Sequence, residues 1–467
     1  MSVRQDGLIK VIRGERFTPL GLARKLKARV ILESSSFKKG RERYSILMPR
    51  EAFRVTQEGS EIFLHRDGGK ENISKGRRDI LDVLLYFASQ HPPLHQDLPM
   101  PAGGIGYLTY EFAACCDTIR FREKADPLEL PDAEFIFGHV FIIFDHYTDM
   151  LYLAALNYSE HEIDLERAVR EVEDRINDLD FNYLAQDTRT YPGRILDPDA
   201  GRGEFMKGVS RVKREIIEGN LLQGVLSRRL SIQTEMPAME AYKHLRSVNP
   251  SPYLFYIDFG GYQLFGSSPE VHVKVKEEKA VLRPIAGTRR RGKTAEEDKL
   301  LEYELLGDEK ERAEHLMLVD LARNDLGRIS RPGTVTVREY MGIEYYSHVM
   351  HIVSEVEGEL AEGKNGADAI RATFPAGTVS GAPKIRAIET IDALEKDPRR
   401  FYAGLVGYVE PGGSMDTCIT IRSALKKNDV IILQAGAGIV LDSTAEREFE
   451  ETGEKLRALA SAVGVEV

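Results

Sequence analysis

Two short segments of the sequence each place a pair of glutamates three residues apart. Glu311 and Glu314 lie in ERAEHLMLVD, and Glu448 and Glu451 lie in EREFEET. On a helix this spacing puts both carboxylates on one face, where they repel each other unless a cation lies between them. A solvated helix face is the alternative for either pair, and Glu311 is also spaced to close a capping box on Asp308. If the two pairs face each other, they form the all-carboxylate kind of site that Mg²⁺ prefers.

A second set of residues could hold an anion. The segment QAGAGIV, residues 434–440, is predicted to end a strand in a Gly-Ala-Gly turn whose bare backbone amides can approach a carboxylate closely. Arg422 in TIRSA and Lys455 in the closing segment add fixed cations. A plain glycine turn is the alternative, so this interpretation depends on the segments coming together in the fold.

Two small-residue stretches and a histidine complete the candidates. LRPIAGTRRRG, residues 282–292, gathers four arginines around Ala-Gly-Thr, and GTVSGAPKIRA, residues 377–387, leads into a helix whose first amides can line a pocket. A tight connector explains the second stretch equally well. His351 and His348 lie three residues apart in an apolar run, where a buried core histidine is the alternative, and the pair lacks the HExxH spacing of a zinc site.

Composition limits the classes of function. The chain has 467 residues, with 64 Lys+Arg against 74 Asp+Glu and a formal net charge of −10, which argues against a general affinity for nucleic acid. The N-terminus has no apolar signal region, and the longest apolar run, VFIIF, is far shorter than the roughly 18 residues that span a membrane. The three cysteines support neither a disulfide framework nor a thiolate metal site. We therefore expect a cytoplasmic protein without a membrane segment.

The elements that must position these residues follow from periodicity and breakers. Residues 17–182 alternate short apolar runs with turn residues and end in a charged helical segment, and a Pro-, Gly- and Asp-rich stretch follows at 186–203. We place a boundary there, giving an N-terminal region of residues 1–199 and a C-terminal region of residues 200–467.

In the C-terminal region the spacing of Phe205, Val209, Val212 and Ile216 predicts a helix, followed by a strand over 221–230. Strands are predicted within 261–275 and 279–288, and at 402–409, 418–425 and 430–440. Long helices are predicted at 309–326 and from Ser443 to residue 463.

Taken in order, PIAGTRRRG, EHLMLVDLARNDLGR, SHVMHIVS, GTVSGAPKIRA, MDTCITIRSAL and QAGAGIVLDSTAEREFEET resemble the chorismate-utilising enzymes, and among them component I of the anthranilate synthases. The resemblance covers nearly all of residues 200–467, and ILESSS followed by RYSI is similar to the regulatory part of that family. It implies an α+β fold of largely antiparallel sheets packed together and flanked by helices.

Two positions bear on the reaction that the resemblance implies. Relatives that add water to chorismate carry a lysine base where this chain has Gln223, and a glutamine cannot deprotonate water, so ammonia is the expected nucleophile. Aminodeoxychorismate synthases carry a nucleophilic lysine where this chain has Ala286. The implied reaction is therefore the conversion of chorismate and ammonia to anthranilate and pyruvate, the first committed step of tryptophan biosynthesis. Aminodeoxychorismate synthase component I and a non-catalytic tryptophan-sensing subunit of the same fold remain the alternatives.

The resemblance also implies roles for single residues. Glu270 is the expected acid for the C4 hydroxyl, His351 assists the second elimination, and Gln223 marks the nucleophile. The enolpyruvyl carboxylate is expected to lie against Tyr402, Arg422 and the amides of 436–438. The implied catalytic residues are Gln223, Glu270 and His351, the implied substrate-binding residues are Gly287, Thr288, Thr378, Tyr402, Arg422, Gly436, Ala437, Gly438 and Lys455, and the implied Mg²⁺ ligands are Glu311, Glu314, Glu448 and Glu451.

Regulation and partners are implied in the same way. NPSPYLFY together with ESSS resembles a site for tryptophan as feedback inhibitor, with Glu33, Ser34, Asn249, Pro252, Tyr253 and Leu254 as the contact residues. A proline-rich tight turn and a strand cap are the structural alternatives for these two segments. The chain has no G-x-C-x-G nucleophile elbow, so it cannot release ammonia from glutamine itself. A glutamine amidotransferase subunit (component II) is therefore the expected partner in a hetero-oligomer.

Overall fold

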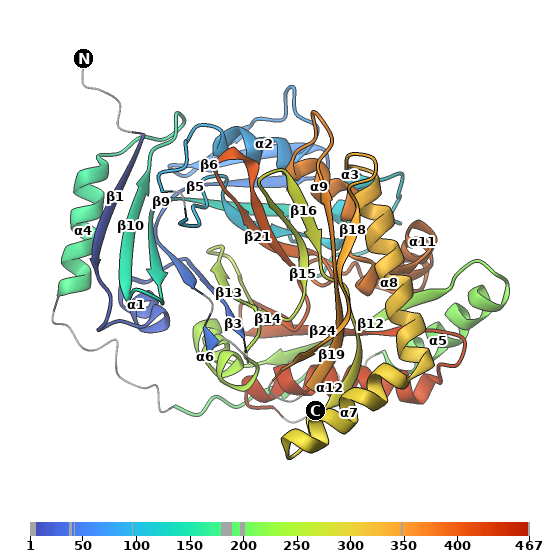
Figure 1. The fold of residues 1–467 in the computed structure, drawn as a ribbon. Helices are drawn as coiled ribbons and strands as arrows, with labels where there is room; N and C mark the ends of the chain where they lie inside the picture. The colour runs from blue at the N-terminus through green and yellow to red at the C-terminus, as the bar shows by residue number, and fades with distance from the viewer. Residues whose placement is uncertain are drawn as a thin grey trace.

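The computed structural model describes residues 6–36, 40–41, 43–95, 97–178, 189–196, 201–346 and 349–465. Two antiparallel sheets form its centre, and helices lie on the outside (Figure 1). Every strand pairing between described residues of these sheets is antiparallel, which confirms the predicted α+β class. His348 and the boundary predicted at residues 199 and 200 lie outside the described residues.

The first sheet contains strands from the N-terminal and the C-terminal part of the chain. Its neighbouring strands follow from the registers of the paired residues. In spatial order they are β1 (Gly7–Arg13), β10 (Met150–Leu156), β9 (Ala133–Asp145), β5 (Tyr44–Glu58), β2 (Val30–Glu33), β13 (Tyr253–Asp258), β14 (Gln263–Ser268), β23 (Ser423–Lys427), β24 (Val430–Ile439), β12 (Gln223–Gln233) and β11 (Arg194–Ile195).

The second sheet shares the long strands β5 and β9 with the first. The 44–48 end of β5 pairs with β2, whereas its 54–58 end pairs with β6, so the strand passes from one sheet into the other. The remaining strands are β7 (Gly69–Asn72), β6 (Glu61–Arg66), β8 (Ile105–Leu108), β21 (Leu405–Val409), β22 (Met415–Ile419), β15 (Val271–Lys276), β16 (Lys279–Leu282), β17 (Ile285–Arg290), β19 (Val349–Glu359) and β18 (Thr336–Tyr345).

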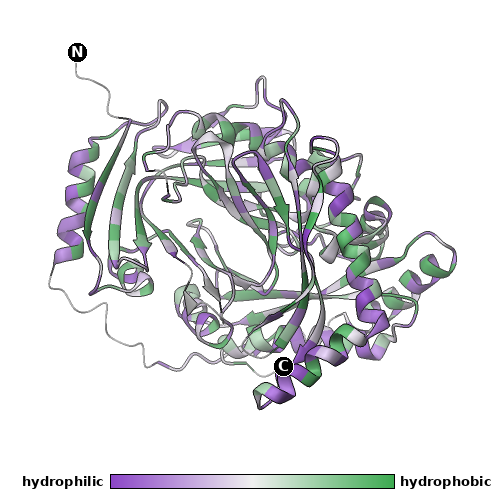
Figure 2. Cartoon of the chain, in the orientation of Figure 1, coloured by the Kyte–Doolittle hydropathy of each residue, from purple (hydrophilic) through white to green (hydrophobic). Residues whose placement is uncertain are grey.

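One large apolar core joins the two sheets, because it contains Phe255 and Leu264 from the first and Phe137 and Val273 from the second. The strands are mostly apolar, whereas the outer helices carry many polar residues on their solvent side (Figure 2). Burial of this apolar surface is the main driving force for the arrangement. The helices are α1 (Pro19–Leu26), α4 (Leu165–Asn177), α6 (Ala238–Val248) and α12 (Ala445–Ala462) on the first sheet, α2 (Ile80–Ala88), α3 (Ala113–Cys116), α8 (Glu309–Gly327) and α9 (Gly366–Thr373) on the second, and α5 (Arg202–Ile217), α7 (Ala295–Gly307), α10 (Gly377–Ser380) and α11 (Lys384–Leu394).

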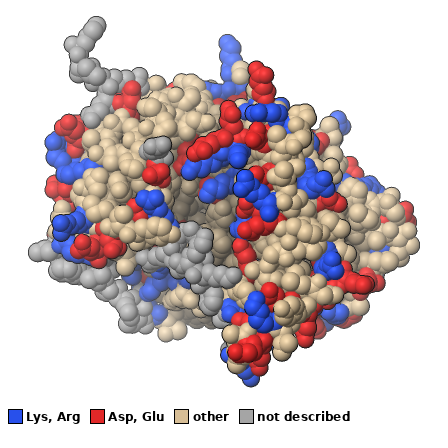
Figure 3. Space-filling model, in the orientation of Figure 1, with Lys and Arg blue, Asp and Glu red and all other residues tan. Residues whose placement is uncertain are grey.

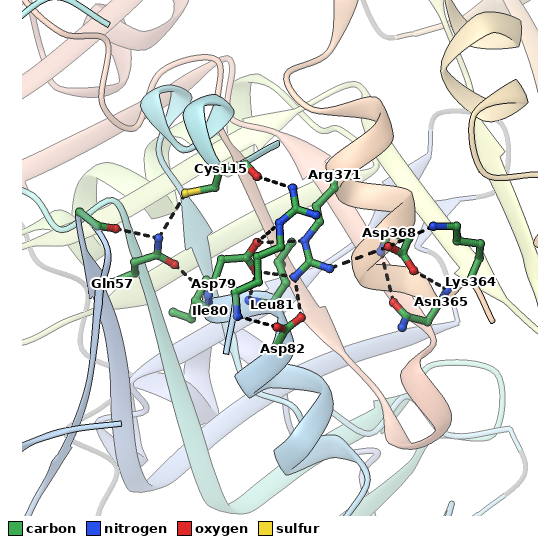
Figure 4. Close-up of polar contacts among 12 residues, drawn as sticks. Gln57, Asp79, Ile80, Leu81, Asp82, Cys115, Lys364, Asn365, Asp368 and Arg371 are labelled. Atoms are coloured by element: carbon green, nitrogen blue, oxygen red, sulfur yellow. Dashed lines mark hydrogen bonds and ion pairs between the residues drawn. The ribbon is translucent and has the colours of Figure 1, made fainter. Parts of the chain in front are cut away.

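Residues on both sides of the predicted boundary pair within the same sheets. Leu254 of β13 lies opposite Glu33 of β2, and Val406 of β21 lies opposite Tyr107 of β8. An ion-pair cluster adds a side-chain link, in which Arg371 of α9 donates to both carboxylate oxygens of Asp79, at 2.7 and 2.9 Å (Figure 4). Asp79 is fully buried and caps the N-terminus of α2, so this link fixes that helix against α9. The division into two regions stays a prediction.

The predicted helices are confirmed within a few residues, including α5, α8 and α12, and so is the strand β12. The single strand predicted over 418–425 is wrong in one respect, because the structure has two strands there, β22 and β23, separated by residues 420–422. Arg422 lies at this break with a φ of 50°. A left-handed backbone conformation is rare for a residue with a side chain, so the surrounding structure must hold it there.

Candidate functional site

A cavity of about 190 Å³ lies at the ends of strands from both sheets, beside α10 and α12. Its walls bring together residues that are more than 180 positions apart in the sequence. The implied catalytic and substrate-binding residues that line it are Glu270, Thr288, His351, Thr378, Tyr402, Arg422, Gly436, Gly438 and Lys455.

Glu270 lies in the connection between β14 and β15 and is 7% exposed. Burial raises the pKa of its carboxyl from 4.5 to about 8, while Thr378 and the positive charge of Arg422 act weakly in the opposite direction. The carboxyl is therefore mostly protonated at neutral pH. A protonated carboxyl that lines a cavity can donate a proton to a leaving group inside it.

His351 on β19 faces the same cavity with one ring nitrogen already engaged. Its Nδ1 lies 3.0 Å from the carbonyl oxygen of Gly287 and 3.1 Å from the hydroxyl of Thr288. A carbonyl can only accept, so Nδ1 carries the proton in this arrangement and the neutral ring keeps a lone pair on Nε2. Burial also lowers the pKa of His351, which favours this neutral form. The ring is thus set to accept a proton or a hydrogen bond through Nε2.

Arg422 supplies a positive charge whose guanidinium forms no ion pair with any described carboxylate, although it lines the cavity. Burial lowers its pKa, which shows that the charge is held at a desolvation cost. Lys455 lies near it but donates to the carbonyl of Gly436 at 2.8 Å and to Glu451 at 2.7 Å. The unpaired guanidinium is the better anchor for a carboxylate in this cavity.

The Gly-Ala-Gly segment is not a turn, so that prediction is wrong. Residues 436–438 continue β24, with Gly436 opposite Ser227 and Gly438 opposite Val225 of β12. The glycines are needed for space, because a Cβ on Gly436 would lie 2.8 Å from the hydroxyl of Tyr402 and one on Gly438 would lie 2.7 Å from Nε2 of Gln223. The pairing of β24 with β23 ends at Leu433, which leaves the other edge of 434–439 open toward the cavity side for amide contacts.

Three of the implied residues do not line this cavity. Ala437 is fully buried in the apolar cluster between β12, α5 and α11, on the opposite face of β24 from its glycine neighbours. Gly287 lies behind Thr288, where a Cβ would approach Oε2 of Glu311 to 3.2 Å. Gln223 is not among the residues that line the cavity, and its Nε2 donates to Oε1 of Glu314 at 3.0 Å.

The two glutamate pairs lie on α8 and α12 and affect each other electrostatically. The pKa of Glu314 is raised first by burial and then by the charges of Glu311 and Glu451, and the pKa of Glu448 is raised by burial and by Glu451. Cations already contact two of the four, since Lys455 binds Glu451 and Arg289 donates to Glu311 at 3.1 Å. Among the described residues no three His, Cys, Asp or Glu side chains are already gathered as a metal site.

Three of the four arginines of 283–291 bind carboxylates of the protein itself. Arg289 also binds Asp308, the N-cap of α8, at 2.9 Å, and Arg291 binds Asp298 of α7. Arg283 binds Glu344 of β18 at 2.6 Å. These ion pairs link β17 and the residues that flank it to α7, α8 and β18. On the face of the molecule shown in Figure 3, Lys and Arg lie interspersed with Asp and Glu.

The residues implied in tryptophan binding lie together on adjoining strands. Glu33 on β2 pairs with Leu254 on β13, and its carboxylate accepts from Arg246 at 2.7 and 2.9 Å and from Tyr242 at 2.9 Å. Tyr253 donates to Asp416 at 2.8 Å. Ser34, Asn249 and Pro252 are partly exposed at the same end of these strands.

Sequence reasoning missed several residues of the cavity wall. Gln434 lines the cavity two positions before Gly436 and four before Gly438, and its Nε2 donates to Ser227 at 2.8 Å. The strand predicted over 430–440 is confirmed as β24, and its two-residue period places Gln434 on the same face as Gly436 and Gly438. The apolar wall residues carry no local sequence signal, and they are Val225, Ile285, Val379, Ile421 and Leu459.

Comparison with known proteins identifies the family of the chain. The chorismate binding enzyme family matches residues 37–461. Anthranilate synthase component 1 of Spirochaeta aurantia is 63% identical over 464 residues, covering 99% of this chain and 96% of its own length, and that of Aquifex aeolicus is 40% identical, covering 96% and 92%.

Solved structures agree as well. Anthranilate synthase component I from Streptococcus pneumoniae superposes with a TM-score of 0.80 at 36% identity, covering 90% of this chain and 92% of that one. The menaquinone-specific isochorismate synthase from Escherichia coli, at 20% identity and a TM-score of 0.74, shares the fold. In the described part of the chain no helix is both long and apolar enough to cross a membrane. The match over most of its length, with relatives up to 63% identical, establishes that the chain belongs to the chorismate binding enzyme family.

Proposed function

We propose that this chain is the chorismate-converting component of an anthranilate synthase, which forms anthranilate and pyruvate from chorismate and ammonia in the first committed step of tryptophan biosynthesis. The observation that carries the proposal is the meeting, in one cavity, of a carboxyl with a pKa of about 8, a guanidinium that pairs with no described carboxylate and a histidine with an open Nε2. The curated relatives named anthranilate synthase component 1 support it.

The proposed reaction has two elimination steps, and different residues of the cavity act in each. Arg422, Tyr402 and the open edge of β24 hold the enolpyruvyl carboxylate, while Glu270 protonates the departing C4 hydroxyl as ammonia attacks C2. In the second step Nε2 of His351 takes the C2 proton or orients the intermediate, the enolpyruvyl group leaves as pyruvate, and the ring becomes aromatic. Burial raises the pKa of Tyr402 to about 12, so its hydroxyl stays a hydrogen-bond donor.

Magnesium fits the four carboxylates of α8 and α12. Glu314 and Glu451 would bind the ion, with Glu311 and Glu448 as ligands directly or through water. Burial and, after it, the charges of the neighbouring glutamates raise the pKa of Glu314 and Glu448, and a divalent cation would relieve that repulsion. When bound, the ion would hold and polarise the ring carboxylate of chorismate.

The nucleophile and its source follow from Gln223 and from the name of the relatives. A neutral amide at this position provides no base for water, and its contact with Glu314 ties it to the carboxylate pairs. Ammonia would come from a glutamine amidotransferase subunit, and a hetero-oligomer in the cytoplasm is part of this proposal. Aminodeoxychorismate synthases carry a nucleophilic lysine at the position of Ala286, and an alanine cannot act as a nucleophile, which argues against that reaction.

Feedback inhibition by tryptophan is the regulatory part of the proposal. Glu33 lies at the junction of β2 and β13, where its carboxylate is held by Arg246 and Tyr242. A ligand ammonium could share this carboxylate, so Glu33→Gln should raise the tryptophan concentration needed for half inhibition about tenfold, with the uninhibited rate kept. Equal inhibition of both proteins would remove Glu33 from the site.

Anthranilate fluorescence from the purified chain tests the function directly. The chain is supplied with chorismate, Mg²⁺ and ammonium at alkaline pH, where ammonia is abundant, and a signal that EDTA and Glu451→Gln abolish is expected. Glu450→Gln on the exposed face of α12 is the matched control and should keep the signal. Formation of 4-amino-4-deoxychorismate in place of anthranilate would favour the sister reaction, and failure to convert chorismate with either ammonium or a glutaminase subunit would refute the proposal.

A further inference from the structure

A second, smaller cavity of about 40 Å³ adjoins the first behind Glu270. Glu270 and Thr378 line both cavities and form the wall between them. The other side is built by α8, by the start of β15 and by the connection that precedes α10, with Leu318, Ala322 and Ala376 among the lining residues. The reactive carboxyl thus faces two spaces, and the proposed chemistry uses only one of them.

The small cavity contains buried polar atoms that lack a protein partner. In the described part of the chain, Nε2 of His272 and the hydroxyl of Thr378 are buried without a hydrogen bond of normal geometry, although the hydroxyl lies close enough to Glu270 to lower the pKa of that carboxyl. The Nδ1 of His272 has a long contact, 3.5 Å, with the hydroxyl of Thr417, and the backbone of Thr373 interacts with the ring closely enough to oppose the lowering of its pKa. Buried polar groups without a protein partner are costly, and in folded proteins they are normally satisfied by an ordered water molecule.

The charge of the cavity favours a neutral occupant. Asp325 and Arg283 line it, and both are paired. Lys384 donates to the Asp325 carboxylate at 2.6 Å, and Arg283 binds Glu344 at 2.6 Å and Glu355 at 3.3 Å. Burial lowers the pKa of His272 to about 3, which keeps its ring uncharged. The volume accommodates about one to three water molecules and no larger ligand.

The proposed reaction creates a water molecule at this wall. Ammonia forms the C2–N bond, the ring double bonds shift, the C4–O bond breaks, and the proton from Glu270 converts the departing hydroxide to water. The new C2 ammonium releases one proton to solvent, and the Glu270 carboxylate takes one back from solvent, so the step balances. The water formed at C4 must leave the reacting carbon before it can add back, while substrate fills the main cavity. On the basis of the proposed function, we propose that the cavity behind Glu270 is a water site that receives the C4 hydroxyl as water, held by His272 and Thr378.

Two variants test the water site without touching the groups placed in the reaction. Ala322→Val fills the cavity with two methyl groups, and His272→Phe removes the ring acceptor while keeping the packing against Phe374, whose ring centre lies 5.5 Å away. Leu318→Met conserves volume in the same wall and is the control. Each protein is assayed for the two steps separately. The first is chorismate consumption with ammonium. The second is anthranilate formation from supplied 2-amino-2-deoxyisochorismate, the product of the first step, which carries the amino group at C2 and lacks the C4 hydroxyl.

We expect Ala322→Val and His272→Phe to slow the first step about tenfold or more, because the departing water no longer has a site to occupy. The rate of the second step should stay within about twofold of the parent. The second step releases no water, so it reports folding and site integrity in the same variant. The KM for ammonium should not change, and a crystal structure should show ordered water bonded to Nε2 of His272.

Several results would overturn the inference. A fall in both steps together would indicate general distortion, and a higher KM for ammonium at an unchanged maximal rate would make the cavity an ammonia route. Unchanged first-step rates, or a dry cavity in the crystal structure, would also refute it. If the parent protein makes anthranilate while any of these results is obtained, only the water site fails; if the parent makes none, the proposed function itself fails.

Discussion

Replacement of Glu270 by glutamine should make the protein more stable while removing its activity. In the folded state the carboxyl has a pKa of about 8, against 4.5 for an exposed glutamate. Between these values the unfolded chain ionises first, which favours unfolding, so the contribution of Glu270 to stability is full below pH 4.5 and declines as the pH rises to about 8. Glutamine mimics the neutral form at every pH and does not pay this cost.

The size of the effect follows from the same two values. At about 1.36 kcal/mol per pKa unit, the stabilisation by Glu270→Gln approaches ~5 kcal/mol above pH 8 and ~3 kcal/mol at pH 7, and it vanishes below pH 4.5. These are upper values, because local opening lets water reach the carboxylate. Even half of the effect would be a large share of the stability of a typical domain.

Chemical denaturation at pH 5, 7 and 9, with and without the substitution, measures this difference. The midpoint of the variant should exceed that of the parent increasingly as the pH rises, whereas Glu450→Gln on the exposed face of α12 should follow the parent. Anthranilate formation should fall about a hundredfold or more in Glu270→Gln. If the parent and Glu270→Gln lose stability in parallel between pH 5 and 9, the carboxyl is not buried in its neutral form and its role as the acid loses its basis.

Three further perturbations follow from the contacts. Arg422→Gln should raise the KM for chorismate about tenfold or more, because no described carboxylate pairs with the guanidinium and its charge is left for the substrate; an unchanged KM in steady-state kinetics would contradict this. Arg371→Met should lower stability by about 3 kcal/mol, since it leaves the buried Asp79 with only the more distant Arg78, at 3.8 Å, and thermal unfolding should show recovery in Asp79→Asn/Arg371→Met. Gly436→Ala should impair both folding and chorismate turnover, because its Cβ would meet the hydroxyl of Tyr402 and the carbonyl of Leu226, each at 2.8 Å, and Gly261→Ala, which meets nothing, is the control.

Local sequence was sufficient where one segment carries the whole signal. The period of apolar residues predicts α5 and α12, and Asp308 is the N-cap of α8, accepting from the amides of Lys310 and Glu311. The motifs in fixed order identify the family, and comparison confirms it. Helix caps and periods depend on neighbours within a few residues, which is why they can be read directly from the chain.

Local sequence failed where a glycine or an arginine serves a distant contact. The segment 434–440 has the composition of a turn, yet β12 keeps it extended and its glycines make room for Tyr402 and Gln223. The arginines of 283–291 suggest a substrate site, yet most of them bind carboxylates of α7, α8 and β18. Composition alone does not distinguish a charge that awaits a ligand from one that is already paired.

The sequence by itself therefore determined the types of the reactive groups, the helices that carry the glutamates and the family. Only the tertiary structure decided the chemical state of those groups. Glu270 has an ordinary side chain, and its raised pKa exists because strands from both sheets remove it from water. Among the described residues Arg422 forms no ion pair, and His351 is fixed in one tautomer by Gly287, which lies far away in the chain. Desolvation and hydrogen-bond geometry arise from packing, so they cannot be present in any single segment.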